Sequence, residues 1–260
     1  MSELVHDSAI VLEQRRIADD IYDMWIETSV AKYARAGQFI NVYPKNSANI
    51  LPRPISICEV EKKKIRIVYR VVGEGTLEFS KYVKNESIRI MGPLGNGFPI
   101  EEINNNQEIN NIVLLGGGIG IPPMLQSMKK LKKESIAILG YRDKNTFLED
   151  EFKEYGEVYC ASEDGSIGTK GNVIDVLREK NMKPDVILSC GPMPMLRAIK
   201  DYARENNIAA YISLEERMAC GVGVCLGCIT KTKKKDEHSK VLNTRICTEG
   251  PVFNAVGVDI

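Results

Sequence analysis

The chain has 260 residues, 43% of them hydrophobic, and its 35 basic and 35 acidic side chains cancel at pH 7. This length predicts two domains with a small additional segment, and the apolar fraction is sufficient for more than one core. Because a chain without net charge has no overall attraction to nucleic acid or to an anionic membrane, we exclude both as partners and expect small molecules and proteins instead.

The longest uncharged run, residues 109–128, reaches the length of a membrane span but is interrupted by glycines and by Pro122 and Pro123. Such residues would break a helix in lipid, so we interpret the run as a buried strand, a glycine turn and the start of a helix. No secretory signal is recognised, and seven cysteines in a chain of this length do not indicate a disulfide framework. We therefore expect a soluble protein of a reducing, cytoplasmic compartment.

The first hundred residues consist of short β-rich segments separated by turn residues. Six segments have this character: residues 9–17, 21–29, 38–44, 54–60, 65–72 and 87–91. They predict a six-stranded antiparallel barrel. Glycines and prolines between Gly92 and Pro99, followed by the polar run 101–111, indicate a linker, and we place the boundary of a first domain, residues 1–102, at this point.

A candidate binding site lies within the predicted barrel. It combines Arg53-Pro54-Ile55-Ser56, Val68-Tyr69-Arg70 and Gly75-Thr76. Arginine can bind a phosphate through two nitrogens, and the Gly-Thr pair supplies backbone and hydroxyl donors. Taken singly, the same residues are ordinary in strands and turns.

From residue 112 to residue 214, apolar runs of strand length alternate with amphipathic helical segments. This alternation predicts a doubly wound parallel sheet, which we assign to a second domain, residues 103–214. The remaining residues, 215–260, show little helical periodicity and are too few to fold stably without a bound group.

A glycine-rich turn, Leu115 to Pro122, follows the first strand of the second domain. Glycine allows a pyrophosphate to approach a helix N-terminus, where free N–H groups favour an anion. The glycines at 116, 118 and 120 depart from the strict dinucleotide fingerprint, so the turn predicts an analogue of the Rossmann fold. At the end of the next strand, Arg142 suits the 2′-phosphate of NADPH and Asp143 suits the hydroxyls of NADH, which leaves the coenzyme open.

Cys190, followed by Gly191 and Pro192, ends the fourth predicted strand of this domain. Ligands of open α/β sheets bind beyond the carboxyl ends of the strands, so Cys190 is expected to face a bound nucleotide. A buried structural cysteine is an equal alternative. We interpret Cys58 and Cys160, both within predicted strands, as core residues.

Four cysteines near the C-terminus follow the spacing of a plant-type [2Fe-2S] cluster: Cys220, Cys225 and Cys228, then Cys247 after eighteen further residues. Glycines between the first three allow the backbone to curl around sulfur and to point N–H groups at it. Structural zinc sites usually pair their ligands in two short clips, whereas Cys247 stands alone, so zinc is the weaker alternative.

Together these motifs resemble the ferredoxin-NADP reductase superfamily, whose members join a flavin-binding barrel to an NAD(P) domain. The segment from Ser213 to Cys228, with Cys247 shortly before Gly250-Pro251, is similar to the electron-transfer subunits of NAD-linked dihydroorotate dehydrogenase. The resemblance covers nearly the whole chain.

The resemblance implies a role for each motif. It implies that Arg53 lies near the FAD pyrophosphate and Ser56 near flavin N5, with Pro54, Ile55, residues 68–70, Gly75 and Thr76 completing the FAD site. Many members carry an aromatic residue where this chain has Ile55. The resemblance also assigns the NAD site to Gly117, Gly118, Gly120 and Pro122, places Cys190, Gly191 and Pro192 near its reactive ring, and makes the four cysteines cluster ligands.

In such a family the partner is an FMN-containing catalytic subunit that oxidises dihydroorotate to orotate in pyrimidine synthesis, in a heterotetramer with two copies of each subunit. Electrons then pass through the [2Fe-2S] cluster and FAD to NAD, because a flavin joins a two-electron donor to a one-electron acceptor. Two alternatives stay open: an NAD(P)H-dependent ferredoxin reductase or hydrogenase flavoprotein subunit, and a zinc-binding, nucleotide-sensing regulator.

Overall fold

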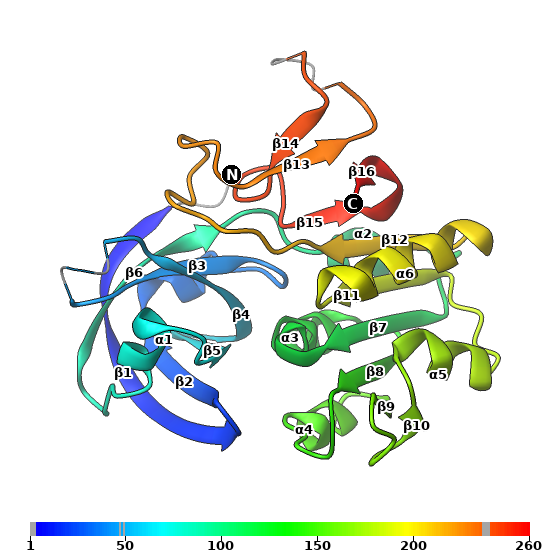
Figure 1. The fold of residues 1–260 in the computed structure, drawn as a ribbon, viewed down its shortest axis with the longest axis horizontal. Coiled ribbons are helices and arrows are strands. Elements are labelled where there is room, and N and C mark those ends of the chain that lie inside the picture. Colours follow the sequence, from blue (N-terminus) through cyan, green and yellow to red (C-terminus); the bar gives the residue numbers. More distant parts are fainter. Residues whose placement is uncertain (1–3, 47, 49, 236–239) are drawn as a thin grey trace.

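The protein is described by a computed structural model covering residues 4–46, 48, 50–235 and 240–260. Figure 1 shows three parts: a barrel, a sheet with helices on both faces, and a small sheet near the C-terminus. No helix within these residues has the length and apolar character needed to cross a membrane.

The N-terminal part is a closed antiparallel barrel with the strand order β1-β2-β5-β4-β3-β6. The prediction of six antiparallel strands is confirmed. Alternate side chains point into the barrel, where isoleucines such as Ile26, Ile40 and Ile67 are fully buried. The strands are β1 (Val5–Ala18), β2 (Ile21–Glu27), β3 (Phe39–Tyr43), β4 (Arg53–Glu61), β5 (Lys64–Arg70) and β6 (Ser87–Leu94), with the short helices η1 (Ser29–Lys32) and α1 (Glu74–Phe79) between them.

The second part is a sheet with the order β10-β9-β8-β7-β11-β12-β15, parallel except for its last strand. Its strands are β7 (Ile112–Gly117), β8 (Ser135–Tyr141), β9 (Glu157–Ser162), β10 (Thr169–Lys170), β11 (Val186–Cys190), β12 (Ala209–Ser213) and β15 (Val252–Asn254). Helices α3 (Pro122–Lys130) and α4 (Glu149–Lys153) pack on one face, and α5 (Val173–Glu179) and α6 (Met193–Glu205) on the other. The predicted doubly wound parallel sheet is confirmed.

The C-terminal residues form a small sheet of β14 (Asn243–Arg245), β13 (Ile229–Thr232) and β16 (Val258–Asp259), with the turn η3 (Ala255–Gly257) before β16. Two features differ from the sequence interpretation. The polar run expected to be a linker begins with helix α2 (Ile100–Asn105), because Ile100 and Ile103 are buried. In addition, β15 extends the parallel sheet through antiparallel pairing with β12. The three-way division of the chain stays a prediction.

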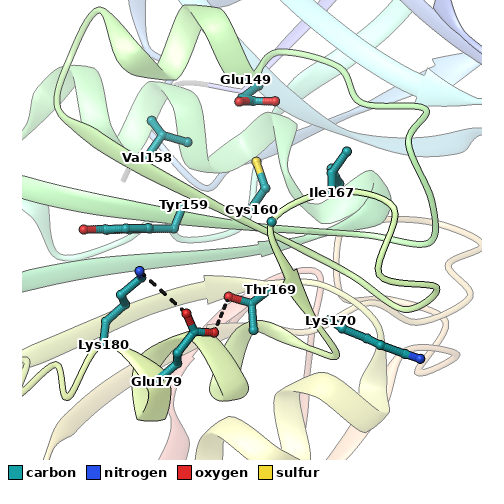
Figure 2. A pocket seen from close by; sticks show the side chains of 10 residues that line it. Glu149, Val158, Tyr159, Cys160, Ile167, Thr169, Lys170, Glu179 and Lys180 are labelled. Carbon is teal, nitrogen blue, oxygen red and sulfur yellow. Dashed lines mark hydrogen bonds and ion pairs between the residues drawn. The ribbon is translucent and has the colours of Figure 1, made fainter.

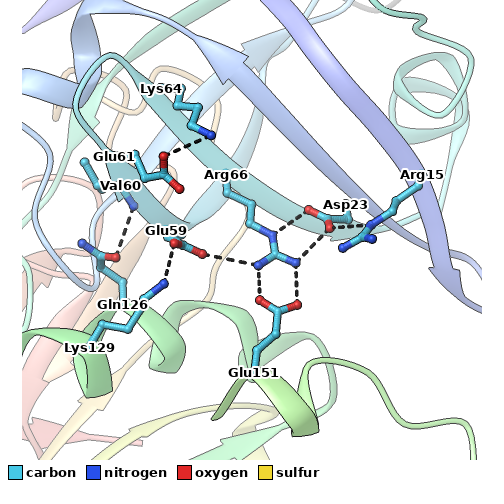
Figure 3. A network of polar contacts seen from close by, with 10 residues as sticks. All are labelled: Arg15, Asp23, Glu59, Val60, Glu61, Lys64, Arg66, Gln126, Lys129 and Glu151. Carbon is cyan, nitrogen blue, oxygen red and sulfur yellow. Dashed lines mark hydrogen bonds and ion pairs between the residues drawn. The ribbon is translucent and has the colours of Figure 1, made fainter. Parts of the chain in front are cut away.

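A network of polar contacts joins the barrel to the sheet (Figure 3). At its centre is Arg66 on β5, with only 3% of its side chain exposed. It donates hydrogen bonds to Asp23 on β2 and to Glu151 on α4. Lys129 and Gln126 on α3 bind β4 through the Glu59 carboxylate and the Val60 N–H. These contacts fix one end of the barrel against helices of the sheet.

Candidate redox sites around the barrel

The residues predicted to bind FAD meet at one end of the barrel. Arg53 begins β4 and Arg70 ends β5, and because the two strands are antiparallel both residues lie at the same end of this strand pair. Gly75, in the first turn of α1, packs on the Arg53 side chain, and a Cβ added there would lie 2.6 Å from Arg53 Nε. Glycine therefore permits the guanidinium to lie against the start of the helix, an arrangement suited to a phosphate.

Some members of this group turn their side chains away from the surface. Tyr69 is buried in the barrel and its hydroxyl donates to Gln14 Oε1 at 2.7 Å. Val68 packs in the core shared with the sheet. The Thr76 hydroxyl accepts the Val72 N–H at 2.9 Å and so shapes the turn into α1. These residues can contact a ligand only through backbone groups or by shaping the turn. Arg53 and Arg70 supply the charged side chains.

The residues predicted to bind NAD meet at the carboxyl ends of β7 and β11. Gly120 packs against the backbone after β11, and a Cβ there would lie 2.4 Å from the Cys190 carbonyl oxygen. Likewise, a Cβ on Gly191 would lie 3.2 Å from the Gly117 nitrogen. Pro122 begins α3 directly after this turn. Because β8 and β11 flank β7 on opposite sides, this is the switch point where open α/β sheets bind ligands.

The residues predicted to bind FAD face the residues predicted to bind NAD. A Cβ added at Gly118, whose φ is +51°, would lie 3.8 Å from Arg70 Nη2. Arg70 belongs to the barrel and Gly118 to the glycine turn of the sheet, so one side chain spans the gap between the two predicted sites.

The Cys190 side chain is half-buried beside Ser213. Burial raises the pKa of the Cys190 thiol to about 12, against a hydrogen bond with Ser213 that lowers it. The thiol is therefore protonated at neutral pH, which is compatible with a hydride-transfer site and unlike the activated cysteine of a nucleophilic enzyme. A role for Cys190 at the reactive ring stays a prediction.

The four C-terminal cysteines lie on two neighbouring segments. Cys220, Cys225 and Cys228 belong to residues 220–228, which we call the cluster loop, and Cys247 follows β14. The Ile246 N–H donates to the Cys228 carbonyl at 2.9 Å and holds the segments together. Cys228 and Cys247 are 2% and 1% exposed, whereas Cys225 is exposed, so one edge of the cysteine group is open to solvent.

Backbone N–H groups converge on the sulfur of Cys220. Val222 and Cys225 both donate to its Sγ at 3.4 Å, and Gly227 donates to Cys225 Sγ at the same distance. Burial raises the pKa of the Cys220 thiol, but these N–H donors outweigh it and lower the pKa to about 6. The loop thus stabilises a thiolate, the form that ligates iron.

The cysteines associate in pairs. Cys225 forms a hydrogen bond with Cys220, and Cys228 with Cys247, whose pKa is raised to about 12 by burial and by that contact. Within the described ranges, no three His, Cys, Asp or Glu side chains gather around a single metal position. One pair of thiolates for each iron is the arrangement that a two-iron cluster requires.

Three residues outside the predicted sites hold the cluster segments in place. Asn41 of β3 donates to the Cys220 carbonyl at 3.1 Å, and Asn96 donates to the Thr248 carbonyl at 2.8 Å. Arg245 donates to the Gly223 carbonyl at 3.2 Å and pairs with Glu249. The only sequence signal for Asn41 is an amide at an outward position of a strand whose alternate residues, Ile40 and Val42, face the core.

A pocket of about 550 Å³ lies elsewhere, at the outer edge of β9 (Figure 2). Cys160, expected to be a core residue, is only half-buried here and faces Glu149. Burial, with Glu149 as the next cause, raises the pKa of its thiol to about 12. Across the strand Glu179 accepts from Thr169 at 2.7 Å and pairs with Lys180 at 3.6 Å. None of the predicted site residues lines this pocket. Cys58, by contrast, is fully buried, as expected.

Comparisons with known proteins agree with this arrangement. Residues 215–259 match the family described as the iron-sulfur cluster binding domain of dihydroorotate dehydrogenase B. The chain is 42% identical to the dihydroorotate dehydrogenase B (NAD(+)) electron transfer subunit of Fusobacterium nucleatum, covering 98% of each chain. It is 40% identical to the protein of that name from Bacillus pumilus, covering 94% of this chain and 95% of the relative.

Two solved structures extend the comparison to the fold. A chain of an NADH-dependent reduced ferredoxin-NADP oxidoreductase aligns with a TM-score of 0.84 at 29% identity, covering 97% of this chain and 90% of that chain. The ferredoxin reductase of a carbazole 1,9a-dioxygenase aligns with a TM-score of 0.64 at 16% identity, over 79% of this chain and 67% of that one, and shows a shared fold.

Proposed function

Because this chain belongs to the family of dihydroorotate dehydrogenase B (NAD(+)) electron transfer subunits, we propose that it carries electrons from a catalytic partner subunit to NAD through a [2Fe-2S] cluster and FAD. The observation that carries the proposal is the convergence of three sites on one barrel. Arg70 faces the glycine turn, Gly75 packs on Arg53, and Asn41 binds the backbone of Cys220.

The residues fit the groups that they are assigned to hold. Arg53 and the start of α1 would hold the FAD pyrophosphate, and Gly117, Gly118 and Gly120 leave room for a dinucleotide at the end of β7. Cys220, Cys225, Cys228 and Cys247 would ligate the cluster. When bound, FAD exchanges two electrons with NAD and single electrons with the cluster.

The chain's own residues orient and protect these sites. The Cys190–Gly191 backbone packs on Gly120, so the glycine turn and the end of β11 would together hold a nicotinamide ring. The neutral Cys190 thiol places no charge beside that ring. Phe39 links two of the sites, because it is paired with Ser56 in the barrel and also packs in the core that contains Cys228 and Cys247.

The partner is proposed to dock over the cluster loop. We define the cluster-loop patch as Val222, Val224, Leu226 and Ile229, which are 37%, 80%, 56% and 40% exposed. A run of exposed apolar side chains at the open edge of the cysteine group is characteristic of a protein interface. We propose that it receives an FMN-containing catalytic subunit, in a cytoplasmic heterotetramer with two copies of each chain, and that NAD binds at the opposite side of FAD.

The test combines reconstitution with a coupled assay. The anaerobically reconstituted chain should contain flavin, iron and acid-labile sulfide, and with the catalytic subunit it should form orotate from dihydroorotate at the expense of NAD. A chain that assembles both cofactors yet supports no such reaction would contradict the proposal. Zinc in place of iron would instead favour the nucleotide-sensing regulator, which the match of residues 215–259 to an iron-sulfur family does not support.

A second candidate is an NAD(P)H-dependent ferredoxin reductase or hydrogenase flavoprotein subunit. It is favoured by the likeness, at a TM-score of 0.84, to a chain of an NADH-dependent reduced ferredoxin-NADP oxidoreductase. The two candidates differ in their partner. NADPH-dependent reduction of ferredoxin without the catalytic subunit would favour this second function, and identification of the protein that co-purifies with the chain would decide between them.

A further inference from the structure

Asn41 is a fully buried amide at the contact between the barrel and the cluster loop. Its side chain is 0% exposed and its Nδ2 donates to the Cys220 carbonyl at 3.1 Å. The orientation of the amide is fixed, because reversing it would bring two oxygens together. Among the described residues, its Oδ1 has no hydrogen-bond partner.

An amide in this state is an unfavourable choice for filling space. A buried oxygen without a partner loses its interactions with water and gains none in return. A leucine of similar shape would avoid that loss if packing were the only requirement. The benefit of asparagine at this position is therefore its Nδ2–H donor, which binds the Cys220 carbonyl.

That donor fixes the orientation of a peptide plane beside a cluster ligand. The carbonyl of Cys220 and the nitrogen of Gly221 belong to one planar unit, so holding the oxygen sets the direction in which the chain leaves Cys220. Gly221 then adopts a φ of +72°, and a Cβ there would lie 2.3 Å from Asn41 Nδ2. Beyond this turn, the N–H groups of Val222 and Cys225 point at Cys220 Sγ.

Hydrogen bonds to ligand sulfur influence the reduction potential of an iron-sulfur cluster. They stabilise the reduced form, which carries more negative charge, and so raise the potential. We propose that Asn41 is a positioning residue that sets the potential of the cluster by fixing the Cys220–Gly221 peptide plane. The proposal rests on the assignment of Cys220 as a cluster ligand.

The position of Asn41 also ties this adjustment to the flavin barrel. Asn41 pairs across β3 and β4 with Pro54, within the segment predicted to hold FAD. The same strand pair therefore carries the FAD segment and the anchor of the cluster loop. A displacement of this strand pair would move the anchor of Cys220 with it.

The test is a redox titration of the assembled complex, followed by electron paramagnetic resonance of the reduced cluster. Asn41→Leu should assemble the cluster with normal iron and sulfide content, shift its midpoint potential to a more negative value and change its g-values. A tenfold change in the electron-transfer equilibrium, about 59 mV for one electron, is the expected scale. An unchanged potential in an intact cluster would overturn the proposal.

Asn96→Leu is the matched control. Asn96 also binds the barrel to the cluster segments, through the Thr248 and Glu249 carbonyls, but it does not contact a ligand cysteine. Its removal should leave the potential unchanged, and an equal shift in both variants would show that general docking is responsible. If Asn41→Leu lacks the cluster, Asn41→Val is titrated instead. Loss of the cluster from both Asn41 variants would also overturn the proposal, because Asn41 would then be needed to form the loop and not to set the potential of the cluster. A wild-type chain without iron would refute the proposed function instead.

Discussion

Arg66 on β5 donates hydrogen bonds to both carboxylate oxygens of Glu151 on α4, so one barrel side chain binds one helix of the α/β sheet through two parallel contacts. Burial disfavours the charge on Arg66, but its hydrogen bonds to Glu151 and Asp23 outweigh this and raise the pKa of the guanidinium above its ordinary value. This pair is a principal polar link between the barrel and the α/β sheet (Figure 3).

Arg66→Leu should destabilise the protein strongly. It leaves the buried carboxylates of Asp23 and Glu59, 2% and 8% exposed, without their shared cation. Breaking a buried pair by removing one partner costs about 3–5 kcal/mol, and we expect the lower end of this range because Arg15 still pairs with Asp23 and Lys129 with Glu59. Urea unfolding monitored by circular dichroism should show a loss of this size. Glu151→Gln is the comparison, because its side chain is 36% exposed and its loss should cost about 1 kcal/mol or less. Equal effects of the two substitutions would contradict this account.

Gly120→Ala should abolish binding of NADH. The added Cβ would lie 2.4 Å from the backbone of Cys190, and the backbone of β11, an inner strand of the sheet, cannot move aside as a flexible side chain can. The matched control is Gly257→Ala, where a Cβ would meet no atom within 4 Å. Titration with NADH should show no saturable binding for the first variant and wild-type affinity for the second. Wild-type affinity in both would mean that the glycine turn does not form the NAD site.

Cys190→Ala should slow hydride transfer without altering its pH dependence. Burial raises the pKa of this thiol to about 12, so the thiol stays protonated between pH 6 and pH 9 and loses its proton only far above that window. We expect a roughly tenfold lower kcat for NADH-dependent dye reduction, because the ring loses part of its support, with a profile of unchanged shape. If a rate step between pH 6 and pH 9 disappears in the variant, Cys190 ionises during turnover and this view of the site is wrong.

The neighbouring strand suggests a prediction for the coenzyme, which Arg142 and Asp143 leave open. β8 and β9 end side by side, and the Glu163 and Asp164 N–H groups donate to the Tyr141 and Arg142 carbonyls, both at 3.3 Å. Backbone hydrogen bonds therefore hold the acidic pair Glu163 and Asp164 beside the Arg142 segment, and we expect these acidic residues to disfavour a 2′-phosphate. Glu163→Gln should raise kcat/KM for NADPH roughly tenfold, by removing one charge from this end of the sheet, and leave NADH nearly unaffected. Steady-state kinetics with both coenzymes would test this, and a parallel change for the two would contradict it.

Local sequence patterns are sufficient to predict the strands and the cluster ligands. Alternating apolar residues such as Ile65 and Ile67 predict a strand of the barrel, and the run 112–115 predicts a buried parallel strand. The cysteine spacing predicts the ligand set. The strand patterns lie within a few consecutive residues, and the cysteine spacing lies within residues 220–247.

Contacts between distant segments could not be predicted in this way. Asn41 and Cys220 are separated by 179 positions, and no local pattern relates a β-strand amide to the carbonyl of a loop cysteine. The same holds for β15, whose three residues join the sheet because β12 presents a free edge. Ile100 and Ile103 lie at or near the start of a polar run, and only burial against the sheet makes their segment a helix.

Val224→Asp should prevent assembly with the catalytic subunit while leaving the isolated chain intact. Val224 belongs to the cluster-loop patch and is 80% exposed, so a carboxylate is solvated in the free chain but must lose that water on docking. Burial of a polar group without a partner costs about 1–3 kcal/mol, so we expect a dissociation constant at least roughly tenfold higher. Val83→Asp, on the barrel at 63% exposure, is the control and should bind normally.

Analytical ultracentrifugation of each variant with the catalytic subunit measures the difference in binding. Iron content and flavin absorbance confirm that both variants carry their cofactors. Normal assembly of Val224→Asp would place the partner elsewhere on the surface, because a carboxylate without a partner could not be buried in the contact without loss of affinity.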